Sequence, residues 1–309
     1  MLSIRTDNLT KNFGTLTAVN GLNLEVRTGE IFGLVGPDAA GKTTTLRMLC
    51  GILPPDRGEA TVAECDIRKQ AEALKEKVGY LPQRFGLYDD LSVLENIQFY
   101  ADLYQVQRKG RAEKIGRLLR FANLEPFGKR KAQDLSGGMK QKLGLICALI
   151  HTPNVLFLDE PTTGVDPLSR RDFWIILYDL LKEGVTILFS TSYLDEAERC
   201  SRVGLIYQGE LLISDTPSAV KARMGGTIFE LRTENNQRAM RRLEGDGSFR
   251  SLVLSGDKIH VLVDDSSQGE KTIRKIIDDE GLNIIDLMVV RPSLEDAFIS
   301  IVRERSGKE

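Results

Sequence analysis

One short segment of the chain has the composition of a phosphate-binding loop. It fits the pattern GxxxxGK[ST] and consists of Gly36, Pro37, Asp38, Ala39, Ala40, Gly41, Lys42 and Thr43. In such a loop, successive backbone N–H groups surround phosphate oxygens, the lysine reaches the β and γ phosphates, and the last hydroxyl binds Mg²⁺. An apolar run at residues 31–35 precedes the loop and a helical pattern at residues 43–49 follows it, the context that this chemistry needs. The alternative is a glycine turn beside an exposed lysine.

A pair of acidic residues closes a second apolar run. Residues 155–158 (VLFL) read as a buried strand, and Asp159 and Glu160 follow directly. The carboxyl ends of parallel strands are where an open α/β sheet places its ligand chemistry. We expect Asp159 to hold Mg²⁺ through water and Glu160 to orient and polarise an attacking water. Because apolar strands often end in acidic residues, this pair indicates a site only together with other motifs.

A third motif, at residues 135–141 (LSGGMKQ), lies at a predicted helix start. A hydroxyl, small residues and a helix N-terminus together form a phosphate-binding arrangement. With this motif added to the other two, the sequence resembles the ATP-binding cassette of ABC transporters. The resemblance covers about residues 2–220 and includes Gln83 at the end of a strand and the loop at residues 164–167 (GVDP) after the acidic pair.

The resemblance implies two ligands, ATP and Mg²⁺, and a set of residues that bind them. Glu160, Ser192 and Gln83 take the places of the catalytic residues, and Thr43, Gln83 and Asp159 those of the metal-binding residues. The positions that contact the nucleotide are the phosphate-binding loop itself together with Phe13, Thr44, Ser136, Gly137, Gly138, Gln141 and Asp166. Phe13 stands where the family has an aromatic residue that stacks on adenine, and the alternative is an ordinary core phenylalanine.

The resemblance also implies two kinds of protein partner. In such cassettes two subunits pack head to tail, so that ATP on the phosphate-binding loop of one subunit meets Ser136, Gly137 and Gly138 of the other. A γ-phosphate shared across an interface favours closure, and this preference disappears after cleavage. Gln83 and residues 84–88 (RFGLY) are expected to sense the nucleotide and to line a groove for a coupling helix of a membrane subunit. The alternative is that the apolar side chains of this segment, Phe85, Leu87 and Tyr88, belong to the core.

The sequence departs from the family pattern at the switch position. Family members usually carry a histidine there, in a pattern like STHYxxEAE, whereas this chain has Ser192. A serine hydroxyl is shorter and cannot carry charge, so it reaches the phosphate only through water. In the phosphate-binding loop, Asp38 adds a negative charge, and Ala39 is costly if the backbone there takes a positive φ. We expect ATP binding with slowed hydrolysis, or one weak site of an asymmetric dimer.

The C-terminal stretch at residues 291–299 (RPSLEDAFI) resembles the ending of ATP-binding subunits of ABC-2-type exporters, including antibiotic and multidrug efflux systems. A proline followed by acidic residues is also simply a favourable helix start. Residues 192–198 (SYLDEAE) are similar to the first cassette of tandem-cassette efflux ATPases. The resemblance therefore implies an ABC-2-type transmembrane permease subunit, with either a homodimer or a heterodimer with a second ATP-binding cassette.

Strand and helix patterns alternate through the first two thirds of the chain, which predicts an α/β fold with a largely parallel sheet. Strands are predicted at residues 31–35, 155–158, 185–190 and 203–207, and amphipathic helices alone at about 90–150. By the resemblance, this fold is a P-loop NTPase of the ABC cassette type, a mostly parallel sheet with a helical insertion. We place the cassette at residues 1–220 and a small C-terminal accessory α+β domain at residues 225–309. Their boundary is expected where two glycines break a helix, at Met224, Gly225 and Gly226.

Composition excludes several classes of protein. The 309 residues carry 42 basic and 44 acidic side chains, a balance that argues against nucleic acid as the main partner. The four cysteines and two histidines lack metal-ligand spacing, and we read the cysteines as reduced, mostly buried thiols. The N-terminus lacks the apolar core of a secretory signal, and no apolar stretch approaches the roughly 20 residues that span a bilayer.

The helical insertion carries a basic run with few acidic residues beside it, between Arg108 and Lys131. Such a run is usually a solvated helix face, and the alternative is a surface near the anionic inner leaflet. We expect a cytoplasmic ATPase subunit, peripheral on the inner face of the cell membrane, that drives export through a separate permease. The alternatives are a soluble ABC-type ATPase without a permease and a regulatory nucleotide-binding module with weak hydrolysis.

Overall fold

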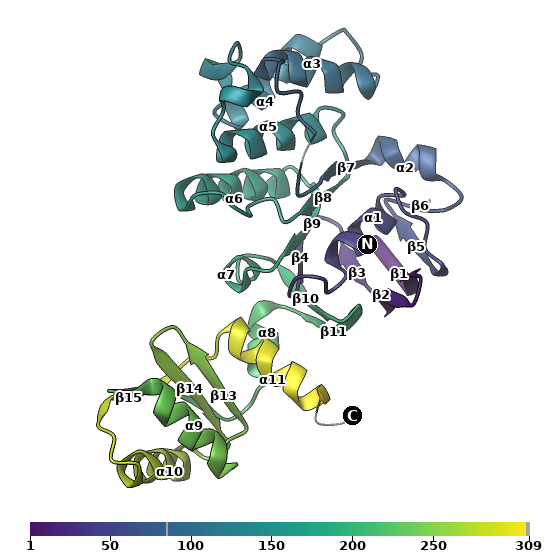
Figure 1. Cartoon of the computed structure of the whole chain (residues 1–309). Helices are drawn as coiled ribbons and strands as arrows, with labels where there is room; N and C mark the ends of the chain where they lie inside the picture. Colours follow the sequence, from purple (N-terminus) through teal and green to yellow (C-terminus); the bar gives the residue numbers. More distant parts are fainter. Residues whose placement is uncertain (85, 307–309) are drawn as a thin grey trace. The chain divides into compact units, whose positions relative to one another are not determined.

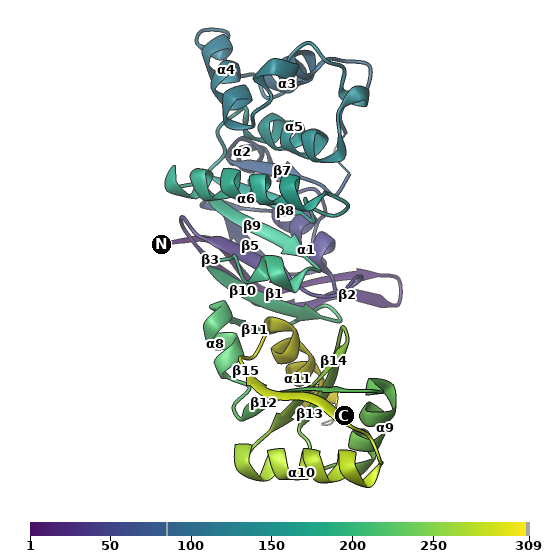
Figure 2. The same ribbon diagram turned by 90° about the vertical axis from the view of Figure 1, so that its left-hand side faces the viewer.

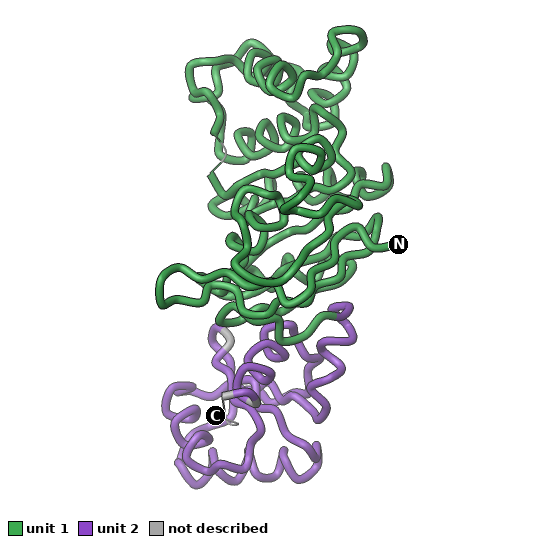
Figure 3. The backbone as a smooth tube through the Cα atoms, turned by 90° about the vertical axis from the view of Figure 1, so that its right-hand side faces the viewer, with its two compact units in different colours: residues 1–214 green, residues 215–309 purple. Residues whose placement is uncertain are grey.

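The computed structural model describes residues 1–84 and 86–306. The chain divides into two compact units, Met1–Ser214 and Asp215–Glu309 (Figure 3). The boundary expected from the sequence lies later in the chain, near Met224. Helix α8 (Pro217–Ala222) accounts for the difference because it packs against α11 (Leu294–Ser306) of the second unit. The predicted limit of residue 220 falls inside α8, whereas the contacts of this helix place all of it in the second unit.

A mostly parallel sheet forms the centre of the first unit, with strands in the order β11-β10-β4-β9-β8-β7. Parallel pairing joins β7 to β8, β8 to β9, β9 to β4 and β4 to β10, so the carboxyl ends of these strands lie at one edge of the sheet. The predicted α/β fold is confirmed, and the predicted strands agree with the observed ones at both ends to within a residue. The strands are β4 (Ile31–Val35), β7 (Val78–Leu81), β8 (Val155–Asp159), β9 (Thr186–Thr191), β10 (Arg202–Tyr207) and β11 (Glu210–Asp215).

A second, antiparallel sheet, which the sequence analysis did not anticipate, packs beside the first (Figure 1). Its path runs β2-β1-β5-β6, with β3 also paired to β1. Helix α1 (Lys42–Leu49) contacts strands of both sheets, so the two sheets share one apolar core. The strands are β1 (Leu2–Phe13), β2 (Leu16–Leu22), β3 (Glu25–Arg27), β5 (Arg57–Val62) and β6 (Cys65–Asp66).

Helix α6 (Pro167–Lys182) covers the parallel sheet (Figure 2). Its residues Phe173 and Trp174 are almost fully buried, and the Trp174 ring lies 4.9 Å from that of Phe189 on β9. Helix α2 (Ala71–Lys77) precedes β7, and the short α7 (Leu194–Ala197) follows β9. Of these helices, α6 and α7 follow the carboxyl ends of β8 and β9, whereas α2 leads into the amino end of β7.

Between β7 and β8 the described residues form helices, and these gather at one end of the unit (Figure 1). The segments are α3 (Val93–Leu103), α4 (Arg111–Phe121), α5 (Gly137–Leu149) and the 3-10 turns η1 (Glu125–Phe127) and η2 (Ala132–Asp134). Ser92 begins α3 with a reciprocal cap: its hydroxyl accepts the Glu95 N–H, and the Glu95 carboxylate accepts the Ser92 N–H. Basic side chains of this region are mostly exposed, and Arg111 pairs with Asp102.

The second unit is an antiparallel sheet in the order β13-β14-β12-β15 with helices packed against it. Apolar residues of its strands and of α9 and α10, among them Phe229, Leu243 and Ile273, form a separate core. Its elements besides α8 and α11 are β12 (Thr227–Thr233), α9 (Asn236–Asp246), β13 (Ser251–Ser255), β14 (Lys258–Val263), α10 (Ser266–Asp279) and β15 (Ile284–Val290).

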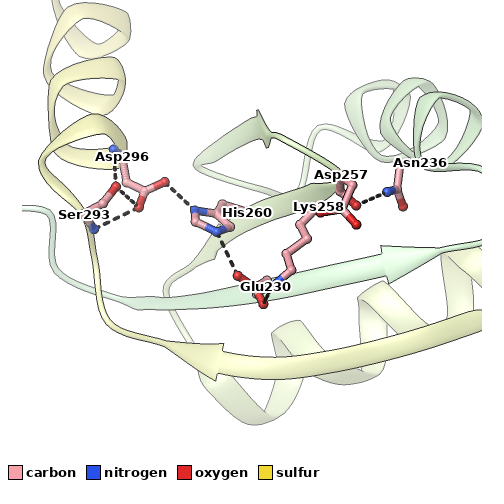
Figure 4. Close-up of polar contacts among 7 residues, drawn as sticks. All are labelled: Glu230, Asn236, Asp257, Lys258, His260, Ser293 and Asp296. Carbon is pink, nitrogen blue, oxygen red and sulfur yellow. Dashed lines mark hydrogen bonds and ion pairs between the residues drawn. The ribbon is translucent and has the colours of Figure 1, made fainter. Parts of the chain in front are cut away.

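A polar cluster attaches α11 to this sheet (Figure 4). His260 on β14 lies 2.8 Å from Asp296 through Nδ1 and 3.4 Å from Glu230 through Nε2, and Lys258 pairs with Glu230 at 2.6 Å. The hydrogen bond to Asp296 raises the pKa of His260, an effect that burial opposes. Ser293, at the start of α11, donates its hydroxyl to Asp296 at 2.6 Å. Protonation of His260 therefore favours this arrangement.

The cysteines Cys50, Cys65, Cys147 and Cys200 are buried and unpaired, as expected. Within residues 1–84 and 86–306, every helix is too short or too polar to cross a bilayer.

Candidate active site

The carboxyl ends of three neighbouring parallel strands bring the predicted site residues together. The N–H of Gly36, after β4, donates to the carbonyl of Thr191 at 3.3 Å. The N–H of Glu160, after β8, donates to the carbonyl of Ser190 at 3.1 Å. The phosphate-binding loop, the acidic pair and the segment that begins at Ser192 therefore share one edge of the sheet.

The backbone of the phosphate-binding loop requires unusual conformations. Gly41 has φ 102°, and a Cβ there would lie 2.4 Å from the carbonyl oxygen of Ala18, so only glycine fits. Ala39 does take a positive φ, 62°, which costs roughly 1 kcal/mol for a residue with a Cβ. Among the described residues, no side chain caps the N-terminus of α1, which follows Gly41. The first N–H groups of this helix are thus available to an anion such as a phosphate.

Lys42 is the central cation of the site. Its side chain is only 4% exposed, and its Nζ donates to the carbonyls of Gly36 at 2.7 Å and Pro37 at 2.9 Å. The same Nζ forms an ion pair with Glu160 at 3.0 Å. Because these partners surround the ammonium, a phosphate that binds Lys42 has to replace at least part of them.

Asp159 is the most buried acid of the site, at 1% exposure. Its Oδ1 accepts hydrogen bonds from the hydroxyls of Thr43 at 3.0 Å and Ser190 at 2.9 Å. Its Oδ2 accepts one from Tyr80 at 3.2 Å, and burial, followed by the Asp159 charge, raises the pKa of Tyr80. A hydroxyl beside a carboxylate is a donor set of hard oxygens that suits Mg²⁺. Thr43 and Asp159 therefore fit the predicted metal-binding role.

Tyr80 and Ser190 are site residues that the sequence analysis did not assign. Tyr80 lies on β7, three residues before Gln83, and Ser190 is a polar residue near the end of an apolar strand. Both signals are weak, because polar residues near strand ends are common. Their approach to Asp159 depends on the pairing of β7 and β9 with β8.

Glu160 occupies the position expected for the residue that activates water. Its side chain is 11% exposed and it has φ 47°, an uncommon conformation for a residue with a Cβ. One carboxylate oxygen contacts Lys42, and the other accepts a hydrogen bond from the Thr163 hydroxyl at 3.3 Å. The surrounding hydrogen bonds hold this strained backbone at the edge of the sheet.

The remaining predicted residues of this edge differ in exposure. Ser192 is partly buried directly after Thr191, whereas Gln83 is exposed two residues after β7. Within the described residues no hydrogen bond joins Gln83 to Asp159, so its catalytic and metal-binding roles stay predictions. Phe13 is 50% exposed, with Lys11 Nζ 5.7 Å from its ring centroid. The core alternative for Phe13 is therefore wrong, and its ring is accessible for stacking.

The LSGG motif caps α5, as predicted. The Ser136 hydroxyl accepts the N–H of Met139 at 3.3 Å. A Cβ on Gly138 would lie 2.4 Å from Ser169 on α6, whereas one on Gly137 would meet nothing within 4 Å. No hydrogen bond or ion pair joins this motif to the phosphate-binding loop in the described part of the chain. Its role in nucleotide binding therefore stays a prediction.

Two further predicted residues lie on α5 and α6. Gln141 has a buried Oε1 that finds no hydrogen-bond partner among the described residues. Asp166 caps α6 and accepts the Ser169 N–H at 2.9 Å. Hydrogen bonds from Ser169, the one from its side chain first, lower the pKa of Asp166, which is therefore ionised at neutral pH.

A groove of about 900 Å³ lies beside the site, between α2, β7 and α3. Three tyrosines line it together with exposed apolar residues and the partly buried His151, whose Nε2 donates to the carbonyl of Val78 at 2.9 Å. Of the segment that was expected to line such a groove, Gln83 and residues 84–88, Gly86 does so, and Pro82 directly before the segment also lines it. Tyr88 is 47% exposed, so the core alternative is wrong for this residue, and Phe85 lies outside the described residues.

Comparison with known families gives two matches. Residues 19–163 match the family model described as ABC transporter. Residues 216–302 match the model described as ATP-binding protein DrrA1-3-like, C-terminal domain. The two matched segments lie in the first and second units of the structure, respectively.

Two curated proteins illustrate the similarity. The probable multidrug ABC transporter ATP-binding protein YbhF of Escherichia coli is 44% identical over 92% of this chain and 49% of its own length, so this chain spans about half of that relative. The linearmycin resistance ATP-binding protein LnrL of Bacillus subtilis is 32% identical over 96% of this chain and 97% of its own length.

Solved structures show the same fold. The structure of cbiO1 from Clostridium perfringens, part of the ABC transporter complex cbiONQ, is 26% identical with a TM-score of 0.67, over 72% of this chain and 92% of that one. A dimeric post-hydrolysis structure of the ATP-binding cassette MJ0796, bound to ADP and Pi, is 25% identical with a TM-score of 0.63, over 69% and 98%.

Proposed function

The chain belongs to the family of ABC transporter ATP-binding proteins, and from this premise we propose that it hydrolyses ATP in a cassette dimer to power export through a separate membrane subunit. The observation that carries the proposal is the contact group at the sheet edge. Two contacts join the phosphate-binding loop to the acidic pair, which is distant in the sequence. The Lys42 ammonium lies 3.0 Å from the Glu160 carboxylate, and the Thr43 hydroxyl lies 3.0 Å from the Asp159 carboxylate. A cation, a hydroxyl and two carboxylates in this arrangement suit a triphosphate with a divalent metal.

Each of these residues has a distinct role in the proposed reaction. Mg²⁺, held by Thr43 and Asp159 and, in the family pattern, by Gln83, would neutralise charge on the phosphates. Lys42 binds phosphate oxygens after it exchanges its contact with Glu160. Glu160, released from Lys42, accepts a hydrogen bond from the attacking water and orients it. Phe13, with its exposed ring, stacks on the adenine.

The geometry of the LSGG motif supports the proposed dimer. Ser136, Gly137 and Gly138 lie at a helix N-terminus on α5, where a phosphate of ATP bound to another cassette would find donors. The dimeric MJ0796 structure supports this arrangement for a related cassette. Steady-state hydrolysis by the purified chain distinguishes an identical partner from a different cassette.

The membrane partner is proposed to be an ABC-2-type permease, which places the chain on the inner face of the membrane. The match of the second unit to the DrrA-like C-terminal domain supports this choice. The groove lined by Tyr80, Tyr100 and Tyr104 supplies a concave, partly apolar surface for a helix of the permease. The names of YbhF and LnrL, a multidrug transporter protein and a linearmycin resistance protein, suggest that the exported molecule is a drug or antibiotic.

Ser192 favours a second candidate function, that of a nucleotide-binding module with weak turnover. The hydroxyl is the only polar group of the Ser192 side chain, and it cannot carry the positive charge of a protonated histidine. In this case the chain binds ATP and dimerises, and a partner cassette supplies the faster site.

Steady-state ATP hydrolysis across a series of protein concentrations tests the proposal. A rate that rises more than linearly with protein, lost in Glu160→Gln and raised in Ser192→His, is the expected result for a working homodimer. Ser218→His, at an exposed serine of α8, is the matched control and leaves the rate unchanged. ATP binding without turnover, and without rescue by Ser192→His, would refute ATP hydrolysis by this chain and support the nucleotide-binding module with weak turnover.

A further inference from the structure

A buried carboxylate outside the predicted site connects two of its loops. Glu196, on the short helix α7, is fully buried. Its Oε2 accepts the hydroxyl of Thr191 at 3.0 Å, and its Oε1 accepts the hydroxyl of Thr162 at 2.7 Å. Both threonines are themselves 1% exposed. A charged group with two such short hydrogen bonds and no access to water fixes the positions of its partners.

Each threonine belongs to a segment of the proposed reaction site. Thr191 directly precedes Ser192, its carbonyl accepts the N–H of Gly36, and its hydroxyl accepts the N–H of Tyr193 at 2.9 Å. The backbone on both sides of Ser192 is thereby fixed through one hydroxyl. Thr162 lies two residues after Glu160, at the beginning of the loop that leads to α6. One carboxylate therefore connects residues 191–193 around Ser192, here called the switch segment, with the loop that follows the proposed catalytic base Glu160.

Two side chains of α6 complete the arrangement. Arg170 lies 3.6 Å from the Glu196 carboxylate, and its guanidinium lies 4.8 Å from the centroid of the Tyr193 ring, next to Ser192. The indole N–H of Trp174 faces the same carboxylate oxygen at 3.5 Å. All four groups around Glu196 are donors, so a carboxylate, with acceptors only, suits this position better than an amide.

We propose that Glu196 is a positioning residue for hydrolysis, which couples the loop after Glu160 to the backbone around Ser192. This inference rests on the proposed ATPase function. Because Ser192 has a short side chain, its alignment with the phosphate depends on where the backbone holds it. Glu196 sets that position and transmits a movement of the loop at residues 160–163 to the switch segment.

Kinetics of three variants test the coupling. Glu196→Gln is expected to lower kcat about tenfold and to change KM for ATP by less than about twofold, because a charged hydrogen bond away from the nucleotide is lost. Thr162→Val and Thr191→Val are each expected to lower kcat in the native background. In the Glu196→Gln background they should lower kcat little further, because groups that act as one unit are not additive. If Glu196→Gln does not fold, the coupling is tested by the two threonine variants and their double variant, whose losses in kcat are expected to be less than additive.

Trp174 gives a second readout that needs no turnover, because it is the only tryptophan of the chain. In the Glu160→Gln background, MgATP is expected to change Trp174 emission, and Glu196→Gln is expected to abolish the change while a fluorescent ATP analogue still binds. Glu30→Gln is the matched control: this buried glutamate pairs with Arg202 at 3.1 Å, before β4, at the opposite end of the sheet. It lowers the melting temperature without altering kcat or the Trp174 response.

The outcomes separate this inference from the proposed function. If Glu196→Gln keeps the native kcat and Trp174 response and only melts earlier, as Glu30→Gln does, then Glu196 is a structural residue and the inference is overturned. The inference is also overturned if the native chain binds and hydrolyses ATP without a change in Trp174 emission and the losses in kcat of the two threonine variants are additive. A native chain that binds no nucleotide overturns the proposed function itself, and the coupling with it.

Discussion

The ion pair between Lys42 and Glu160 predicts that removing the charge of Glu160 strengthens ATP binding. In the structure the two groups are 3.0 Å apart, with side chains 4% and 11% exposed, so water screens the pair weakly. ATP has to separate them, because its phosphates take Lys42. Replacing Glu160 by glutamine leaves a neutral hydrogen bond to Lys42 in place of a charged one, and the competitor for the ammonium becomes weaker.

The size of the effect follows from the difference between the two kinds of hydrogen bond. A hydrogen bond to a charged group contributes about 1.5–3 kcal/mol and a neutral one about 0.5–1.5 kcal/mol, so the change removes about 1–1.5 kcal/mol. Since 1.4 kcal/mol corresponds to a factor of ten, the dissociation constant for ATP should fall about tenfold. The nucleotide-free variant should lose a similar free energy of unfolding, because the same contact stabilises it.

Equilibrium titration with a fluorescent ATP analogue, in EDTA and at low protein concentration, measures this effect without dimer closure or hydrolysis. Asp172→Asn is the matched control, because it also converts a lysine-paired acid to an amide. Its pair with Lys142, at 3.2 Å, joins α6 to α5 outside the contact group. We expect this control to reduce stability without changing ATP affinity. Unchanged or weaker ATP binding by Glu160→Gln would refute the competition between phosphate and Glu160.

Three further predictions concern other parts of the chain. Gly138→Ala should lower the free energy of unfolding by about 1–3 kcal/mol, measured by denaturant titration, because the added Cβ would lie 2.4 Å from Ser169 on α6. Gly137→Ala, whose added Cβ has no atom within 4 Å, should reduce turnover without changing the free energy of unfolding. Phe13→Ala should weaken ATP binding by about 1–3 kcal/mol through lost stacking, and equal affinities in both proteins would exclude that contact. Asp296 raises the pKa of His260, so protonation of His260 contributes to the free energy of unfolding. This contribution is complete below the usual imidazole pKa and is lost as the pH rises through the pKa of His260 in the folded protein. The melting temperature should therefore fall more between about pH 6 and 9 in the native chain than in His260→Gln, and parallel curves would contradict the link.

The sequence determined the elements whose signals are local. The strands before Gly36 and Asp159 are continuous apolar runs, and a run of that kind indicates a strand buried on both faces wherever it occurs. The phosphate-binding loop is equally local, because glycines, a lysine and a threonine at fixed spacing shape their own backbone around an anion. The family could be recognised for the same reason, since its motifs are short and contiguous.

The antiparallel sheet could not be predicted in this way. Strand β1 has only a few buried apolar residues, such as Ile4 and Leu9, among exposed polar ones. Its stability as a strand comes from pairing with β2, β3 and β5, which are separate in sequence. A half-exposed strand of this kind carries too weak a periodic signal to be distinguished from a loop.

The contacts among site residues were decided by the tertiary structure. Tyr80 and Ser190 reach Asp159 because the parallel register of three strands places them there, and their spacing in the sequence carries no trace of it. Glu196 looks like one more acid of a charged stretch, yet the fold buries it between Thr162 and Thr191. The physical reason is that a motif describes the backbone near one ligand group, whereas a hydrogen-bond network forms between segments that meet only when the sheet assembles.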